Sequence, residues 1–137
     1  MKKGQLTKYP IKILLAFGEA IDGNDKIFDW LLKNGYPELA ALTKAIRGSD
    51  EAFHWLMNNG YPHLAALDMA IVNDKKAYEW LEKYKFTFLI LFADATRGKK
   101  EAIRWLAMHD LQIFIRISKI IKNFTDNQKF DYHKLHF

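Results

Sequence analysis

Apolar residues recur along this chain in a regular, long-period pattern. The clearest mark of the pattern is a tryptophan followed by leucine, evenly spaced at Trp30, Trp55, Trp80 and Trp105. Periods of roughly 20–50 residues are typical of stacked repeat architectures. In this register the chain divides into units 11–35, 36–60, 61–85 and 86–110 and a degenerate capping unit 111–135, in which Phe130 takes the tryptophan position.

The first half of each unit predicts a helix. Apolar side chains occupy its fourth, seventh, tenth and eleventh positions, with Thr96 the exception, and spacings of three and four residues place them on one helical face. Proline at the second position, Pro37 and Pro62, suits the first turn of a helix. The thirteenth position holds the residue types that most readily take the left-handed conformation that ends a helix. These residues are Gly23, Gly48, Asn73, Gly98 and Asn123.

A second helix is expected after each stop. The residues that follow accept hydrogen bonds from the free N–H groups of a helix start, and they include Asn24, Ser49 and Asp74. The apolar stripe of this helix contains the Trp-Leu pair and is wide, as expected for a helix with neighbours on both sides. Gly35 and Gly60 end the helix in the first two units, and we expect a looser turn where Lys85 and Asp110 replace them.

The row of tryptophans has two interpretations. Exposed indole rings at a regular spacing are a stacking platform for bases or sugars. A fixed position beside a leucine is instead typical of rings packed between neighbouring units. We expect the four rings to lie in the core.

The predicted fold class is therefore all-α, an αα-solenoid or right-handed superhelix of five 25-residue helix-turn-helix repeats that forms one domain over residues 1–137. A helix pair of this length cannot bury its own apolar face, so neighbouring units must cover it. The ends of such a stack must be polar. Met1 to Thr7 and Phe124 to Leu135 are rich in polar residues, and we expect them to cap the two ends.

The segment from Ala45 to Gly60 resembles the helix-turn-helix portion of an ankyrin repeat. Small residues precede a glycine, an apolar pair leads to a bulky residue and leucine, and Asn-Gly closes the segment. Units 11–35 and 61–110 look similar. An ankyrin unit has about 33 residues, a Thr-Pro-Leu-His opening and a β-hairpin; this repeat is too short for the hairpin and lacks the tetrapeptide. The resemblance implies an ankyrin-like helical pair without the finger, and binding of a protein partner without catalysis.

Charge adds a second candidate function. The net charge of +5 lies entirely in residues 69–137, which hold 13 basic and 8 acidic residues, against 8 of each in residues 1–68. This excess permits an acidic protein or a nucleic acid as partner. A nucleic-acid-binding helical repeat that uses the basic second half is thus the alternative to a protein-interaction module. The basic residues concerned are Arg97, Lys99, Lys100, Arg104, Arg116, Lys119 and Lys122.

The most variable positions of the first helices give the candidate binding surface. If these helices stack side by side, their ninth and twelfth positions form a strip that is apolar in the middle and basic at its flanks, suited to an acidic or amphipathic protein segment. Drift of solvated positions explains the same variation without function. The strip consists of Lys44, Arg47, Met69, Val72, Asp94, Arg97, Lys119 and Lys122.

Chemistry has little support in the sequence. The chain has no cysteine, no phosphate-binding glycine loop, no nucleophile elbow and no two-histidine zinc motif, so we expect no enzyme and no cofactor. Asp131, His133 and His136 have the residue types of a metal site, but a polar tail explains them better. His54, His63 and His109 are expected at the surface or at unit boundaries. No apolar run reaches the roughly 20 residues of a membrane span, and we expect a cytoplasmic protein that does not bind membranes.

Overall fold

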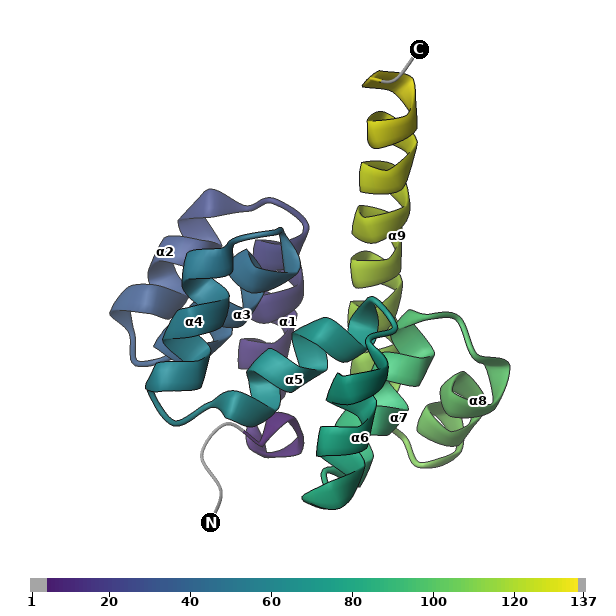
Figure 1. The fold of residues 1–137 in the computed structure, drawn as a ribbon. Coiled ribbons are helices and arrows are strands. Elements are labelled where there is room, and N and C mark those ends of the chain that lie inside the picture. The colour runs from purple at the N-terminus through teal and green to yellow at the C-terminus, as the bar shows by residue number, and fades with distance from the viewer. Residues whose placement is uncertain (1–4, 136–137) are drawn as a thin grey trace.

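The structure is a computed structural model that describes residues 5–135, with side chains described as far as residue 127. The described chain is helical throughout its regular elements and contains no strand (Figure 1). One short 3-10 turn precedes nine α-helices. The elements are η1 (Leu6–Lys8), α1 (Ile11–Ile21), α2 (Asp25–Lys33), α3 (Pro37–Ile46), α4 (Asp50–Asn58), α5 (Pro62–Ile71), α6 (Lys75–Lys83), α7 (Thr87–Thr96), α8 (Lys100–Met108) and α9 (Gln112–Leu135).

The predicted start and stop signals act as expected in the first four units. Three of the four second helices begin with a side-chain cap, in which Asn24, Ser49 and Asp74 accept hydrogen bonds from the backbone N–H three residues later. The thirteenth residue has positive φ in each of these units, and the N–H of the next residue donates to a carbonyl five residues earlier. Each first helix is therefore closed by the same αL turn.

The turn at the end of the second helix differs from the expectation in one respect. Gly35 and Gly60 have positive φ, and Lys85 and Asp110 keep the same conformation, with φ of 61° and 58°. The prediction of a looser turn at Lys85 and Asp110 is therefore wrong. The backbone geometry is retained in all four units, although a side chain with a Cβ is strained there.

The fifth unit is not a helix pair. Helix α9 runs through Asn123 as one helix of 24 residues, so the prediction of a stop at this residue is wrong. Asn73 does end a helix, and there the next residue, Asp74, caps the helix that follows. In the fourth unit Lys99 provides no side-chain cap, but Gly98 takes positive φ at no steric cost. The fifth unit has neither feature, because Asn123 is followed by Phe124, whose side chain accepts no hydrogen bond, and the helix continues. The described residues thus form four helix pairs and one long final helix.

The helices form two layers around a closed ring. The first helices α1, α3, α5 and α7 pack in sequence as an inner layer, and α9 packs against both α7 and α1. The outer helices α2, α4, α6 and α8 each bridge the two inner helices that precede and follow them. In Figure 1, α9 continues past the ring toward the C-terminus. The all-α helical repeat fold is as predicted, but its first and last inner helices cover each other.

The seam between α1 and α9 shows how the ring closes. Gly18 is buried, and a Cβ placed on it would lie 3.3 Å from Ile120 Cδ1 and 3.6 Å from Ile117 Cγ1. Arg116 forms an ion pair with Glu19 at 3.7 Å at the edge of the seam. The two ends of the stack therefore pack against each other. Gly18 has no Cβ, and this allows the two helices to approach closely. The expected polar caps, 1–7 and 124–135, lie largely outside the described side chains.

The core lies between the two layers. The leucine of each Trp-Leu pair is fully buried, at Leu31, Leu56, Leu81 and Leu106. The tryptophans are not in the core, and the prediction that they are is wrong. The exposed fractions are 46% for Trp30, 37% for Trp55 and 40% for Trp105, while Trp80 is partly buried. Successive residues of a helix point about 100° apart, so a leucine that faces the inner layer leaves the preceding indole at the outer edge.

Candidate partner-binding grooves

Two apolar grooves lie on the outer face of the molecule, and their linings are related by the repeat. Groove 1 lies between α2 and α4 over α3 and has a volume of about 410 Å³. Groove 2 lies between α4 and α6 over α5 and has a volume of about 300 Å³. Groove 1 is lined by Phe28, Leu32, Pro37, Ala40, Ala41, Lys44, Ser49, Glu51, Ala52 and Trp55. Groove 2 is lined by Phe53, Met57, Pro62, Ala66, Met69, Asp74, Lys76, Ala77 and Trp80, each of which stands exactly one repeat after a groove 1 residue.

Small residues on the inner helices make the grooves. The outer helices contact the inner layer far more than each other, so the space between two outer helices is open down to the inner helix beneath. At the floor, α3 presents Pro37 and Ala41, and α5 presents Pro62 and Ala66. Proline begins each of these helices because its missing N–H costs nothing in the first turn. Larger floor residues would fill the space.

Aromatic rings form the walls of the grooves. Trp55 and Trp80 stand on one side of grooves 1 and 2, and each ring is supported from behind by the first residue of the next unit. Trp55 stacks on Tyr61 with centroids 6.0 Å apart and an interplanar angle of 10°, and Trp80 stacks on Phe86 at 5.7 Å and 6°. Stacking holds each indole in one orientation. The walls are therefore preformed although part of each ring contacts solvent.

Each groove carries one lysine and one carboxylate at its rim. In groove 1 the Lys44 ammonium lies 4.5 Å from the centre of the Phe28 ring, and Glu51 is in the first turn of α4. In groove 2 Asp74 caps α6 by accepting a hydrogen bond from the Ala77 N–H at 3.1 Å, and Lys76 is in the first turn of α6. A carboxylate is stabilised at a helix N-terminus, whereas a lysine there is not.

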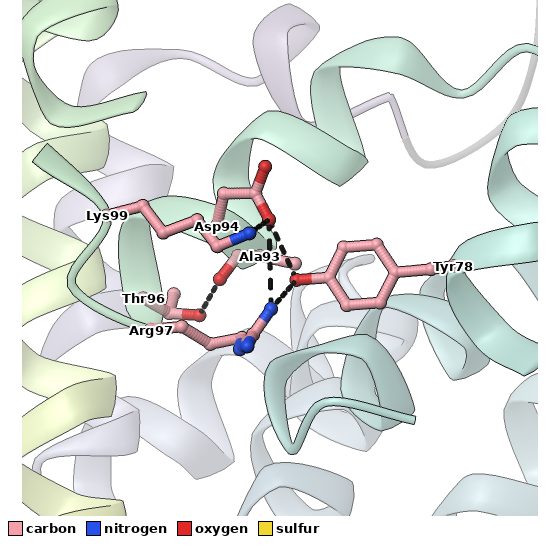
Figure 2. A network of polar contacts seen from close by, with 6 residues as sticks. All are labelled: Tyr78, Ala93, Asp94, Thr96, Arg97 and Lys99. Atoms are coloured by element: carbon pink, nitrogen blue, oxygen red, sulfur yellow. Dashed lines mark hydrogen bonds and ion pairs between the residues drawn. The ribbon is translucent and has the colours of Figure 1, made fainter. Parts of the chain in front are cut away.

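The equivalent position between α6 and α8 is crossed by polar contacts instead (Figure 2). Figure 2 shows the Tyr78 hydroxyl directed at Asp94 and Arg97, with Lys99 on the same carboxylate. The hydroxyl donates to Asp94 Oδ1 at 2.9 Å and accepts from Arg97 Nη1 at 3.0 Å, and Lys99 Nζ lies 3.6 Å from Asp94 Oδ1. Burial raises the pKa of Tyr78 above its ordinary value; the hydrogen bond to Asp94 adds to this rise, and the Arg97 contact opposes it.

This network replaces the apolar contacts of the two grooves. Tyr78 occupies the same repeat position as Phe53, and Asp94 occupies the same repeat position as Met69. Two substitutions at the equivalent positions therefore exchange an apolar opening for a set of hydrogen bonds that joins α6 to α7. The outer face is thus open and apolar over α3 and α5, and polar over α7.

The predicted strip is only partly brought together. At the ninth position Lys44 and Met69 line grooves 1 and 2, Asp94 lies in the polar network, and Lys119 lies in a separate polar cleft with Glu19 and Asp22. The ninth positions of α3, α5 and α7 therefore face outward between the outer helices, whereas that of α9 lies beside α1.

The twelfth positions point elsewhere. In the second, third and fourth units they are the C-cap residues of the first helices rather than part of the helical face. Arg47 donates to the Ile21 carbonyl at 2.8 Å and lies over the Phe124 ring, so it belongs to the seam of the ring. Val72 is exposed. Arg97 contacts Tyr78, and Lys122 pairs with Asp126 at 3.0 Å. The prediction of one continuous strip is therefore not matched by the geometry.

The groove walls were not identified from the sequence as binding residues. A signal was present, because aromatic or large residues recur at the eighteenth and twentieth positions of the first four units while alanine recurs at the sixth position of three units, Ala16, Ala41 and Ala66. An alanine between recurring large residues marks a place where a helix surface is left unfilled. The expectation that the tryptophans lie in the core left this pattern without a link to a binding surface.

Four of the seven basic residues that the sequence suggested for nucleic-acid binding form ion pairs. Arg97 and Lys99 both contact Asp94, Arg116 contacts Glu19 and Lys122 contacts Asp126. Within the described residues, the ion pairs do not include Lys100, Arg104 or Lys119.

The remaining candidate residues have ordinary positions or lie outside the described side chains. His54 and His109 are exposed, and His63 is buried at a unit boundary, at the start of α5, with its ring stacked 5.1 Å from that of Phe86; these positions agree with the expectation of surface or boundary residues. The described residues contain no cluster suited to a metal ion. The side chains of Phe130, Asp131, His133 and His136 lie outside the described residues.

Asp68 is the one carboxyl, among the described side chains, whose protonation the fold strongly changes. It lies on α5 at the eighth position of its unit, where other units have small residues such as Gly18 and Ala93. Burial raises the pKa of the Asp68 carboxyl to about 6. Neither groove includes this residue.

Among the described residues, every helix is too short or too polar to cross a membrane. No protein-family model, curated protein or solved structure matches the chain. What can be inferred about function therefore comes from the molecule itself.

Proposed function

We propose that the protein is a non-catalytic protein-interaction module that binds a partner through grooves 1 and 2. The observation that carries the proposal is the pair of open apolar grooves with equivalent linings, each walled by a stacked tryptophan. Adjacent apolar openings with a few polar rim residues are typical of recognition surfaces. Aromatic rings held in place at an interface supply much binding energy at a low entropic cost.

Protein is favoured over nucleic acid by the electrostatics of the basic half. Four of the seven cations named above contact carboxylates, which would compete with phosphate groups for them. The grooves also lie over α3 and α5, away from the basic excess of α8 and α9. We assign the grooves no chemical step and no cofactor, because the ionisable residues of each groove are one lysine and one carboxylate at its rim.

The proposal is tested with charge substitutions at exposed apolar residues of the outer helices. Leu32 and Met57 stand at equivalent positions in grooves 1 and 2 and are 48% and 47% exposed. Met108 on α8 is 75% exposed and lines neither groove, so Met108→Glu is the matched control. Exposed substitutions of this kind change the free energy of unfolding by only about 0.5 kcal/mol.

The assay is a selection of binders from a displayed peptide library, followed by affinity measurements on the selected peptides. We expect Leu32→Glu and Met57→Glu to weaken binding at least tenfold, about 1.4 kcal/mol, and Met108→Glu to leave it unchanged. Binders that are equally sensitive to all three substitutions would refute the proposal. Tight binding of unrelated RNA or DNA that falls steeply from low to physiological salt would instead support the nucleic-acid alternative.

A further inference from the structure

The two grooves are spaced for a ligand with two apolar anchors. They are related by one repeat, and the inner helices beneath them, α3 and α5, pack directly on each other. Contacting helices lie about 8–10 Å apart, so equivalent points of the two grooves are separated by roughly that distance or a little more. Residues seven apart on a helix lie on one face about 10.5 Å apart. Same-face residues of a strand lie about 7 or 13 Å apart and fit less well.

The chemistry of the groove walls also favours a helix. In groove 2, Phe53, Met57, Pro62, Ala66, Met69 and Trp80 present apolar surface along most of the lining. An extended segment laid on such a surface would bury backbone N–H and C=O groups without partners, which costs free energy. A helix forms these hydrogen bonds internally and can present its apolar face to a groove.

A lysine at the rim of groove 2 indicates an acidic side chain on the partner. Helix α4 opens with Asp50 and Glu51, as the helix dipole favours, whereas α6 opens with Lys75 and Lys76 and has no acidic residue in its first turn. Lys75 pairs with Glu79 along the helix. Lys76 lines groove 2, and the ion pairs within the described residues do not include it. An incoming carboxylate would meet this ammonium group, whereas the positive end of α6 is already capped by Asp74.

We propose that grooves 1 and 2 together bind one amphipathic helix of a partner protein, with two apolar anchors seven residues apart and an acidic side chain beside the anchor in groove 2. The proposal rests on the proposed function and specifies its ligand. The helix lies across α4, with one anchor against Trp55 and the other against Trp80. Its carboxylate faces Lys76.

The test uses four synthetic peptides of about 18 residues, or about 27 Å when helical. The first is helix-forming, with leucine at two positions seven apart and glutamate beside the second leucine. In the second peptide one leucine is alanine, in the third the glutamate is lysine, and in the fourth a central proline breaks the helix. Binding is followed by tryptophan fluorescence, because Trp55 and Trp80 line the grooves, and is confirmed by calorimetry.

We expect the first peptide to bind at least about tenfold more tightly than the one-anchor peptide. Lys76→Glu should weaken the first peptide about two- to fivefold and strengthen the lysine peptide by a similar factor. Lys75→Glu is the control on the same turn, since Lys75 already has an intrahelical partner and lines neither groove. The proposal is supported if Lys76→Glu reverses the preference for the glutamate peptide over the lysine peptide and Lys75→Glu changes this preference less.

Three results overturn it. Equal binding of the proline peptide means that the grooves take an extended segment, and leaves the proposed function standing. No binding of the first peptide, while library peptides still depend on Leu32 and Met57, excludes an acidic two-anchor helix but keeps the module. If sedimentation shows that the parent chain self-associates and that Met57→Glu abolishes this, the occupant of the grooves is a second copy of the chain. Failure of the proposed function itself is distinct, because then no library peptide depends on either residue.

Discussion

Trp55 and Leu56 are adjacent in the sequence but differ in role. We expect substitution of Leu56 to lower mainly the stability of the fold, and substitution of Trp55 to weaken mainly partner binding. Leu56 is fully buried, and in cores of this kind Leu→Ala costs about 3–5 kcal/mol because a cavity remains. Trp55 has the larger side chain but is 37% exposed and borders an open groove, so its removal leaves no closed cavity.

The cost of Trp55→Ala follows from the surface it covers. An enclosed indole buries about 150–250 Å², and at this exposure roughly 100–150 Å² remains out of water, worth about 2.5–4 kcal/mol at about 25 cal/mol per Å². The unfolded chain already shields part of this area, and alanine keeps its Cβ, which lowers the expected cost to about 2 kcal/mol.

The assay is urea unfolding of the two variants and the parent chain, together with affinity for a groove-dependent peptide. We expect Leu56→Ala to destabilise more, and Trp55→Ala to weaken binding more under conditions in which both variants are folded. The reasoning fails if Trp55→Ala is the more destabilising of the two, since the indole would then belong to the core.

Three further predictions concern the ring and its turns. Gly18→Leu should destabilise the protein by about 1–3 kcal/mol in urea unfolding, although leucine favours helices by about 0.8 kcal/mol over glycine, because the side chain would meet α9 at the seam; increased stability would mean that α1 and α9 separate readily in solution. Asp68→Asn should increase stability at pH 7 by about 1–3 kcal/mol relative to the parent chain, with the gain disappearing as pH falls from about 6 to about 4. The folded state holds this proton more tightly than the unfolded state, so the parent loses stability as pH rises through that window, and a gain that does not vary with pH would exclude Asp68 as the cause. Lys85→Gly should raise stability by about 0.5–1 kcal/mol because it relieves a positive φ of 61°; a loss in thermal unfolding would show that the Lys85 side chain makes a contact that offsets the strain.

The local structure of the first four units was predictable because its causes are local. Caps such as Ser49, prolines in the first turn and residues with positive φ each act within a few positions of the chain. The same local causes explain the error in the last unit: Asn123 lacks the conformational freedom of glycine, Phe124 provides no cap, and the helix continues.

The closure of the ring was not predictable from the repeat. A repeated sequence determines how each unit packs on the next one. Small rotations between units accumulate over the whole stack, however, and these decide whether its two ends meet. Gly18 at the eighth position of its unit, opposite Ile117 and Ile120, becomes meaningful only once α1 and α9 are known to touch. The grooves depend on the same long-range geometry, because the curvature of the inner layer determines how far the outer helices separate.

The central claim is that the surface between the outer helices over α3 and α5 contacts a partner protein. It is tested most directly with a photo-crosslinking amino acid placed at position 57 in groove 2 and, as the control, at position 108 on α8, in the cells that produce the protein. The account predicts a discrete crosslinked partner from position 57 that disappears when Leu32→Glu is added, and no such product from position 108. The same products from both positions would contradict it.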